Sequence, residues 1–162
     1  MKTLIAYATK HGAAGKCAEK LLKKLNGDVK LENLKKAKNI DISKYDQVII
    51  GSSVYMGQIR KEARKFCEER LNELKEKTVG LFICCMSEED TARKQIKDNY
   101  PEQLIEKATA VKNFGGGFDF NKMNFLERII IKKMAGANES ESNIIEENIE
   151  RFAQLINEKI VA

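Results

Sequence analysis

The sequence predicts an α/β domain in which a mostly parallel β-sheet is covered by helices on both faces. Short, continuous apolar segments recur along the chain, as expected for strands that are buried on both sides. Segments with the apolar spacing of amphipathic helices lie between them, which indicates repeated strand–helix–strand units. The 162 residues contain one proline, and we find no linker and no internal repeat, so a single domain over residues 1–162 is expected.

Five segments have the composition of strands. Four are short apolar runs, and the second in the chain alternates between apolar and polar residues. The five predicted strands span residues 2–8, 29–34, 47–52, 79–85 and 108–114. Residues 35–45 show little pattern, and we expect only a short helix there.

Three segments have apolar residues at helical spacing, over residues 17–25, 59–74 and 144–160. Asn143 and Glu146 have the spacing of a capping box at the start of the last helix. Ser87 and Asp90 form a variant of this pattern before a helix that follows the fourth strand.

The composition excludes several classes of protein. No apolar run approaches the roughly 20 residues that cross a bilayer, and the apolar start is too short for a signal peptide, so we expect a cytoplasmic protein. The formal net charge of +5 permits an anionic ligand without requiring one. Because the lysines are scattered over several helices rather than gathered in one patch, nucleic-acid binding is not expected.

Cysteine and histidine are too sparse for common metal and catalytic sites. The four cysteines form no Cys-x-x-Cys pair and the chain has one histidine, so neither a zinc site nor a disulfide framework is expected. A hydrolytic triad would need His11 as its base, and no acidic or nucleophilic partner is evident beside it in the sequence. We therefore assign no catalytic residue and no metal ligand.

The loops at the carboxyl ends of the strands are expected to form one ligand site, since ligands of open parallel sheets bind there. Small and polar residues follow the first strand and precede a helix, a pattern that suits a phosphate group but also an ordinary tight turn. The residues proposed to contact the ligand here are Thr9, Lys10, His11, Gly12, Ala13 and Ala14.

Two further loops extend this expected site. After the third strand, Tyr55 and Met56 could sandwich a planar ring, or could simply cover the sheet edge. After the fourth strand, Cys84 and Cys85 could be redox-active, although small buried residues are the favoured interpretation. The glycine run 115–117 frees the backbone for a close approach or a turn. The candidate ring contacts are Ser52, Ser53, Val54, Tyr55, Met56, Gly57, Cys84, Cys85, Met86 and Ser87.

Residues 5–21 resemble the phosphate-loop signature of the flavodoxins. Tyr7, Thr9, Gly12, Ala18 and Leu21 occupy its expected positions. The signature differs at two positions, where an alanine replaces a larger apolar residue (Ala6) and a threonine (Ala14). The resemblance implies a flavodoxin-like three-layer sandwich with strand order 2-1-3-4-5. It also implies non-covalent flavin mononucleotide (FMN), with its phosphate at residues 9–14 and its ring between the other two loops.

A narrower resemblance extends over nearly the whole chain. Residues 45–53 and 125–136, with residues 120–122 before the latter, are similar to the flavodoxin-like protoporphyrinogen dehydrogenases. This implies an oxidoreductase that takes electrons from a reduced, porphyrinogen-like substrate through FMN, with a quinone or a redox partner protein as the other expected partner. An electron carrier between protein partners, and a flavin-free binding module in which Ala14 has removed a phosphate donor, are the alternatives.

The segment from Met123 to Met134 has the pattern of an amphipathic helix. Its apolar stripe is flanked by basic residues. The favoured interpretation is a helix packed on the domain. The alternative is a lip beside the ligand that binds a flat apolar molecule or makes peripheral contact with a membrane. The sequence does not predict an oligomeric state.

Overall fold

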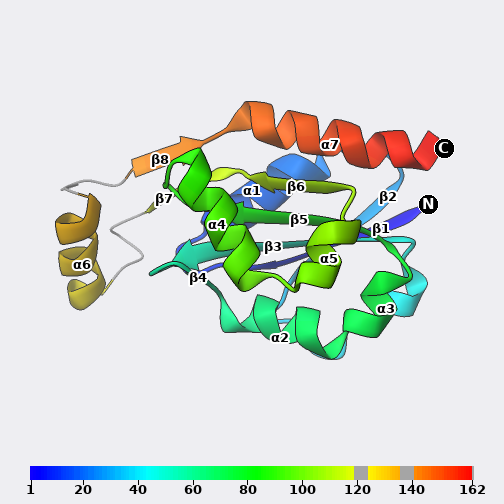
Figure 1. Cartoon of the computed structure of the whole chain (residues 1–162), viewed down its shortest axis with the longest axis horizontal. Helices are drawn as coiled ribbons and strands as arrows, with labels where there is room; N and C mark the ends of the chain where they lie inside the picture. Colours follow the sequence, from blue (N-terminus) through cyan, green and yellow to red (C-terminus); the bar gives the residue numbers. More distant parts are fainter. Residues whose placement is uncertain (119–123, 136–140, 162) are drawn as a thin grey trace.

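The computed structural model describes residues 1–118, 124–135 and 141–161. Its main sheet has the parallel order β2-β1-β3-β5-β6, which is the flavodoxin-like order expected from the sequence (Figure 1). Each of the five expected strands is present, with ends shifted by a few residues. These strands are β1 (Lys2–Ala8), β2 (Asp28–Asn33), β3 (Gln47–Tyr55), β5 (Thr78–Cys84) and β6 (Ala110–Asn113).

Helices cover both faces of the sheet, so the predicted three-layer arrangement is confirmed. One face is covered by α1 (Ala13–Leu22) and α7 (Glu146–Val161). The other face is covered by α2 (Lys61–Glu69), α3 (Leu71–Lys75), α4 (Glu89–Asn99) and α5 (Glu102–Lys107). The weakly patterned connection contains only the short 3-10 helix η1 (Ile42–Lys44), as expected.

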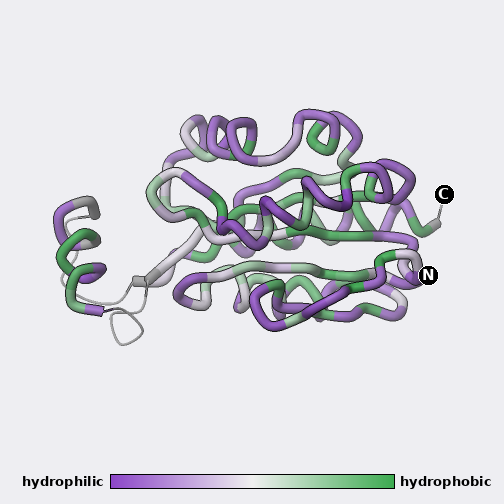
Figure 2. Tube along the Cα trace, turned by 90° about the horizontal axis from the view of Figure 1, so that it is seen from below, coloured by the Kyte–Doolittle hydropathy of each residue, from purple (hydrophilic) through white to green (hydrophobic). Residues whose placement is uncertain are grey.

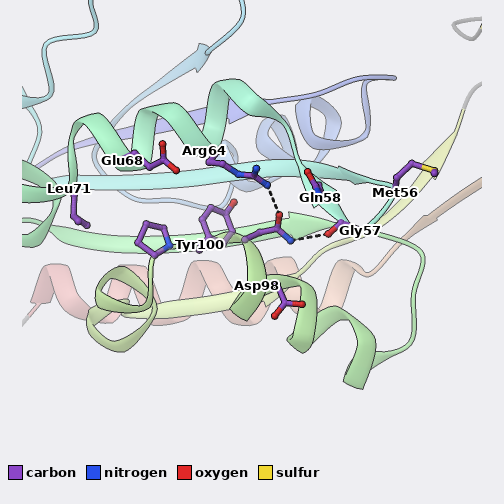
Figure 3. A pocket seen from close by; sticks show the side chains of 10 residues that line it. Met56, Gly57, Gln58, Arg64, Glu68, Leu71, Asp98 and Tyr100 are labelled. Atoms are coloured by element: carbon purple, nitrogen blue, oxygen red, sulfur yellow. Dashed lines mark hydrogen bonds between the residues drawn. The ribbon is translucent and has the colours of Figure 1, made fainter.

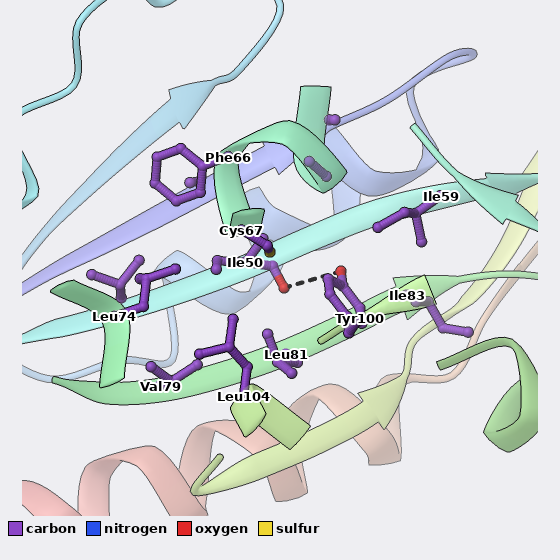
Figure 4. Packing of buried hydrophobic residues seen from close by; sticks show 14 of the residues in the cluster. Ile50, Ile59, Phe66, Cys67, Leu74, Val79, Leu81, Ile83, Tyr100 and Leu104 are labelled. Atoms are coloured by element: carbon purple, nitrogen blue, oxygen red, sulfur yellow. Dashed lines mark hydrogen bonds between the residues drawn. The ribbon is translucent and has the colours of Figure 1, made fainter. Parts of the chain in front are cut away.

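The core has two layers because successive strand residues point to opposite faces of the sheet. Ile50 and Leu81 pack beneath α2 and α5, whereas Ile49 and Phe82 pack beneath α1 and α7. In the first layer the buried Tyr100 hydroxyl donates to the carbonyl oxygen of Phe82 at 2.7 Å, so its polar end is satisfied. A longer contact of the same hydroxyl, 3.4 Å from the carbonyl oxygen of Ile50, is drawn in Figure 4. Both layers are apolar, which explains the continuous apolar character of the central strands.

The third strand is longer than predicted. Instead of ending at Ser52, β3 continues to Tyr55 and turns back into the short antiparallel strand β4 (Gln58–Ile59). Met56 and Gly57 form the turn with φ angles of 54° and 76°. Positive φ at both central residues is the backbone of a tight hairpin turn that matches the twist of the strands. Residues 53–55, predicted as loop, are therefore strand.

A second hairpin, not predicted from the sequence, carries the amphipathic segment. Strands β7 (Gly115–Phe118) and β8 (Glu141–Ile144) pair antiparallel. Between them lies α6 (Phe125–Ala135), which stands apart from the two helical layers (Figures 1 and 2). The glycine run makes a close approach, since a Cβ on Gly116 would lie 3.2 Å from the Cys85 backbone.

Neither predicted capping box forms. Helix α7 begins at Glu146, and Asn143 is instead paired with Gly116 inside β8. Helix α4 begins at Glu89, with Glu88 as its N-cap and without a side-chain cap hydrogen bond. In the first case the backbone groups of Asn143 are used by the strand pairing, so the residue cannot take the N-cap position.

Candidate functional site

The loop between β1 and α1, residues 9–12, is held in one conformation by backbone hydrogen bonds. We call it the first loop. The Gly12 N–H donates to Thr9 Oγ1 at 2.9 Å, and the Lys10 N–H donates to Ser53 Oγ at 3.1 Å. Gly12 is the N-cap of α1 in the left-handed region, with φ of 92°, where a side chain would be strained. The first loop is therefore anchored to β3 and leads directly into the N-terminus of α1.

The N-terminus of α1 is suited to an anion. Its N-cap makes no side-chain hydrogen bond, and the first turn contains no acidic residue. The first-turn N–H groups of any helix lack partners within the helix, and the helix dipole adds partial positive charge there. Lys10 and His11 lie in the preceding loop, with side chains that are 23% and 11% exposed. This donor set fits a phosphate monoester.

An acidic residue lies against this loop, contrary to the interpretation of His11 drawn from the sequence. The Nε2 atom of His11 is 2.7 Å from Oε2 of Glu127, and Nζ of Lys10 is 3.7 Å from Oε1 of the same carboxylate. The Glu127 side chain is only 18% exposed. His11 therefore has an acidic neighbour, which comes from α6 rather than from an adjacent part of the chain.

Glu127 is oriented by the start of its own helix. The Asn124 side chain accepts a hydrogen bond from the Glu127 N–H at 2.9 Å and donates to Glu127 Oε1 at 3.2 Å. The Asn-x-x-Glu spacing is a capping pattern that the sequence analysis overlooked. That spacing could have indicated where α6 begins, but not that its carboxylate meets His11.

The end of β3 adjoins the first loop. The Lys10 Nζ atom lies 3.6 Å from the centroid of the Tyr55 ring, a distance at which a cation is attracted to an aromatic face. Ser52 is fully buried, and its Oγ accepts from the Arg60 N–H at 2.9 Å. Met56 is 59% exposed at the hairpin tip. Among these candidate residues, Ser52 holds the backbone at Arg60 through its hydrogen bond, whereas the side chains of Tyr55 and Met56 are at least partly exposed to solvent.

The loop after β5 begins in the core and ends in solvent. Cys84 and Cys85 are buried, whereas Met86 and Ser87 are exposed. Burial raises the pKa of the Cys84 thiol well above its ordinary value and also raises the pKa of Cys85. Both thiols therefore favour the neutral form that is poorly nucleophilic, which agrees with the favoured interpretation of them as small buried residues.

Asn113 connects this loop to β6 and β7, and the sequence analysis did not single it out. Its Oδ1 atom accepts from the N–H groups of Cys85 at 3.2 Å and Gly115 at 3.0 Å. Its carbonyl oxygen accepts from Asn148 Nδ2 at 2.8 Å. These bonds hold the ends of β5 and β6 beside the start of the second hairpin. A single asparagine in a strand gives no sequence signal for this role.

Four large apolar side chains are exposed in segments at or beyond the carboxyl ends of the strands. Phe125 and Leu126, at the start of α6, are 76% and 69% exposed. Met56 and Met86, at the ends of the β3 and β5 segments, are also exposed. In the first turn of α6, Phe125 and Leu126 therefore face solvent, whereas Glu127 contacts the first loop. Met123, the first residue of the predicted stripe, lies outside the described residues.

A groove of about 770 Å³ lies on the α2 side of the hairpin tip (Figure 3). Asn99, one of its lining residues, accepts from the Ile59 N–H and Arg64 Nη2, at 3.0 and 3.1 Å, and donates to the Gly57 carbonyl oxygen at 3.0 Å. The side-chain amide of Asn99 is thus satisfied by groups of the same groove. The groove includes no residue of the first loop.

Metal and membrane features were also assessed over residues 1–118, 124–135 and 141–161. No group of three or more potential metal-ligating side chains occurs among them. Within the same ranges, every helix is too short or too polar to cross a bilayer.

A family model described as a flavodoxin domain matches residues 4–144. The chain belongs to the flavodoxin domain family. The match includes the first loop, both hairpins and α6, so these features lie within the flavodoxin domain itself. A comparison with curated protein sequences finds no match.

Solved structures support the flavodoxin fold. A flavodoxin from the domain Archaea is 17% identical, with a TM-score of 0.63 and 100% of both chains covered. A Streptococcus pneumonia TIGR4 flavodoxin is 16% identical, with a TM-score of 0.62 and 100% of both chains covered. The Fusobacterium nucleatum flavodoxin bound to flavin mononucleotide is 15% identical, with a TM-score of 0.56, and the alignment covers 99% of this chain and 97% of that one.

Proposed function

We propose that this flavodoxin-domain protein binds FMN at the carboxyl edge of its sheet. The observation that carries the proposal is the uncapped N-terminus of α1, preceded by Lys10 and His11. In this proposal the phosphate meets the first loop and the start of α1, where backbone N–H groups and two basic side chains favour an anion. The alanine at position 14 contributes its backbone N–H, which does not require the missing hydroxyl.

The same proposal places the flavin ring between the end of β3 and the loop after β5. Ser53 and Cys84 are register partners in adjacent strands, so the two segments are neighbours at the sheet edge. Tyr55 and Met56 provide an aromatic face and a thioether on one side, and Met86 provides an exposed thioether on the other. When bound, FMN supplies one- and two-electron chemistry, and the protein binds, orients and shields it.

For the reaction, we propose oxidation or reduction of a flat apolar molecule of the porphyrinogen or quinone type. Phe125 and Leu126 give an exposed apolar surface on α6, and the exposed Lys132 and Lys133 on the same helix suit acidic side groups of such a molecule. The alternative is an electron carrier between protein partners, which the full-length similarity to flavodoxins favours. A substrate-specific reaction separates these two functions.

Cofactor binding is tested first by an absorption spectrum of the purified protein, before and after addition of FMN and dialysis. Retained flavin absorbance is the expected result. Folded protein that retains no flavin would contradict both redox functions and would favour a flavin-free module on the same fold.

The substrate proposal is tested with Leu126→Asp and a conservative control, Leu126→Met. Since Leu126 is 69% exposed, neither change should alter the unfolding free energy appreciably. Leu126→Asp should slow anaerobic reduction of bound FMN by a porphyrinogen, or reoxidation of reduced FMN by a quinone, by about tenfold or more, whereas Leu126→Met should not. Flavin that is reduced by a reductase but exchanges electrons only with protein acceptors would favour the carrier.

A further inference from the structure

The carboxylate of Glu127 lies where the first loop would receive an anionic ligand. It is within 2.7 Å of His11 and 3.7 Å of Lys10, the two basic side chains that precede α1. The carboxylate is also largely shielded from solvent, at 18% exposure, whereas neighbouring positions on α6 are open. An internal carboxylate thus occupies the cationic part of the proposed phosphate site.

We propose that Glu127 is an internal competitor for the ligand's phosphate group. While the first loop holds no phosphate, Glu127 docks the start of α6 on Lys10 and His11. A phosphate bound to the same two side chains displaces the carboxylate and releases α6 from the loop. This inference rests on the proposed FMN function and adds to it a coupling between phosphate binding and the position of α6.

The charges make simultaneous binding unfavourable. A phosphate monoester carries a charge of about −1.5 to −2 at neutral pH, and Glu127 adds a further negative charge when ionised. Two like charges that share one shielded site raise each other's free energy, so the better ligand excludes the other. Phosphate has the advantage because it also accepts hydrogen bonds from the first-turn N–H groups of α1, with more acceptor oxygens than a carboxylate.

Little apolar burial opposes this release at the start of α6. Phe125 and Leu126 are 76% and 69% exposed, so moving this end of the helix uncovers little apolar surface. The helix start is stabilised locally by Asn124, whose hydrogen bonds to Glu127 do not depend on the first loop. Once α6 leaves the loop, its first turn is therefore held by Asn124 alone, and it opens more readily than in the docked position.

Lys10 extends the effect to the proposed ring site. Its ammonium group lies 3.6 Å from the Tyr55 ring centroid, so it covers one face of that ring. A phosphate that attracts Lys10 uncovers this face at the moment when the flavin ring arrives. Phosphate binding, release of α6 and exposure of Tyr55 are then linked through one lysine.

The first experiment compares FMN with riboflavin, which has the same ring but no phosphate. Binding is measured by fluorescence titration to the wild type, to Glu127→Gln and to Glu146→Gln. Glu146 is a matched control because it pairs with Lys20 of α1 at 2.5 Å, away from the first loop. Glu127→Gln should bind FMN about fivefold or more tightly than the wild type does, with unchanged riboflavin affinity. Glu146→Gln should leave both affinities unchanged.

The second experiment measures hydrogen exchange of residues 124–135 in the wild type. FMN should increase exchange at the start of α6, and riboflavin should not. Equal FMN affinity of the wild type and Glu127→Gln, or protection of α6 by FMN, would overturn the competition while leaving FMN binding intact. Absence of FMN binding by all three proteins would instead overturn the proposed function, and the competition with it.

Discussion

Gly51 in β3 lies at a position where the packed core leaves no room for a side chain. A Cβ at this position would lie 1.9 Å from the Phe82 ring, which is fully buried and stacked on Phe114. Gly57 presents the opposite case, since a Cβ there would meet no atom within 4 Å but its φ is 76°. The first glycine is required by space and the second by backbone conformation.

Substitution of these two glycines should therefore have different effects. Gly51→Ala should lower the unfolding free energy by about 3 kcal/mol because the Phe82 ring has no room to move. Gly57→Ala should lower it by about 1 kcal/mol, from backbone strain alone. Urea denaturation followed by circular dichroism measures both values. A smaller loss in Gly51→Ala than in Gly57→Ala would contradict the packing described here.

Cys67 provides a prediction for alkaline pH. Burial raises the pKa of its thiol from 9.0 to about 12 in the folded protein. Between these values the unfolded chain loses the thiol proton and the folded chain keeps it, so stability falls as the pH rises. This group alone should contribute a slope of about 1.4 kcal/mol per pH unit in that window.

The test compares the pH dependence of unfolding in the wild type and in Cys67→Ala. At neutral pH the variant is less stable because it leaves a cavity, but its slope above pH 9 should be shallower. The burial of Cys84 and Tyr100 adds to the slope in both proteins, and the loss of Cys67 also removes one of the lesser causes of the raised Tyr100 pKa. Identical slopes would show that the Cys67 thiol does not resist ionisation.

At the scale of an element, the N-terminus of α1 combines a helix dipole with two basic residues of the first loop. The double substitution of Thr9→Ala with Lys10→Ala removes the oxygen that accepts the Gly12 N–H and one positive charge. It should weaken FMN binding by about 10- to 100-fold, as expected for loss of a charge-assisted hydrogen bond and a fixed loop.

Flavin fluorescence titration measures this effect. Lys23→Ala is the control, because it removes the same charge from an exposed site just beyond the other end of α1. It should leave FMN affinity unchanged, and both proteins should keep the circular dichroism spectrum of the wild type. FMN affinity unchanged by the double substitution would exclude the first loop as the phosphate site.

At the scale of the whole molecule, three aromatic rings join the sheet to the helical layer of α1 and α7. Phe82 of β5 stacks on Phe114 at 4.4 Å between centroids, and Phe152 of α7 meets both rings edge-on, at 6.3 and 5.2 Å. Phe114 lies between β6 and β7, so the same cluster supports the base of the hairpin that carries α6. Packing among these three rings therefore connects the hairpin that carries α6 to the core of the domain.

Phe152→Ala should lower the unfolding free energy by about 3–5 kcal/mol, because it opens a cavity among fully buried rings. Phe125→Ala makes the same chemical change on α6, where the ring is 76% exposed, and should change stability by less than about 0.5 kcal/mol. Chemical denaturation of both variants provides the comparison. Similar losses would mean that α6 is packed as a core element.

The apolar pattern predicted the five strands of the main sheet, and the family resemblance implied their order. Apolar runs and helical spacing are local properties of a sequence. The apolar runs are clear in the central strands because residues on both faces of the sheet, such as Ile49 and Leu81, are buried. The resemblance in residues 5–21 supplied the family, which the family model confirms. The assignment of phosphate and ring contacts stays a prediction.

The contact between the first loop and α6 depends on the folded chain and could not be predicted from the sequence. Glu127 and His11 lie far apart in sequence, and nothing in the pattern around either residue specifies their contact. The hairpin of β7 and β8 was missed for the same reason, since a glycine run and a polar segment show no strand periodicity until each pairs with the other. Patterning in a sequence reports what each segment buries, whereas contacts between distant segments depend on how the whole chain is folded.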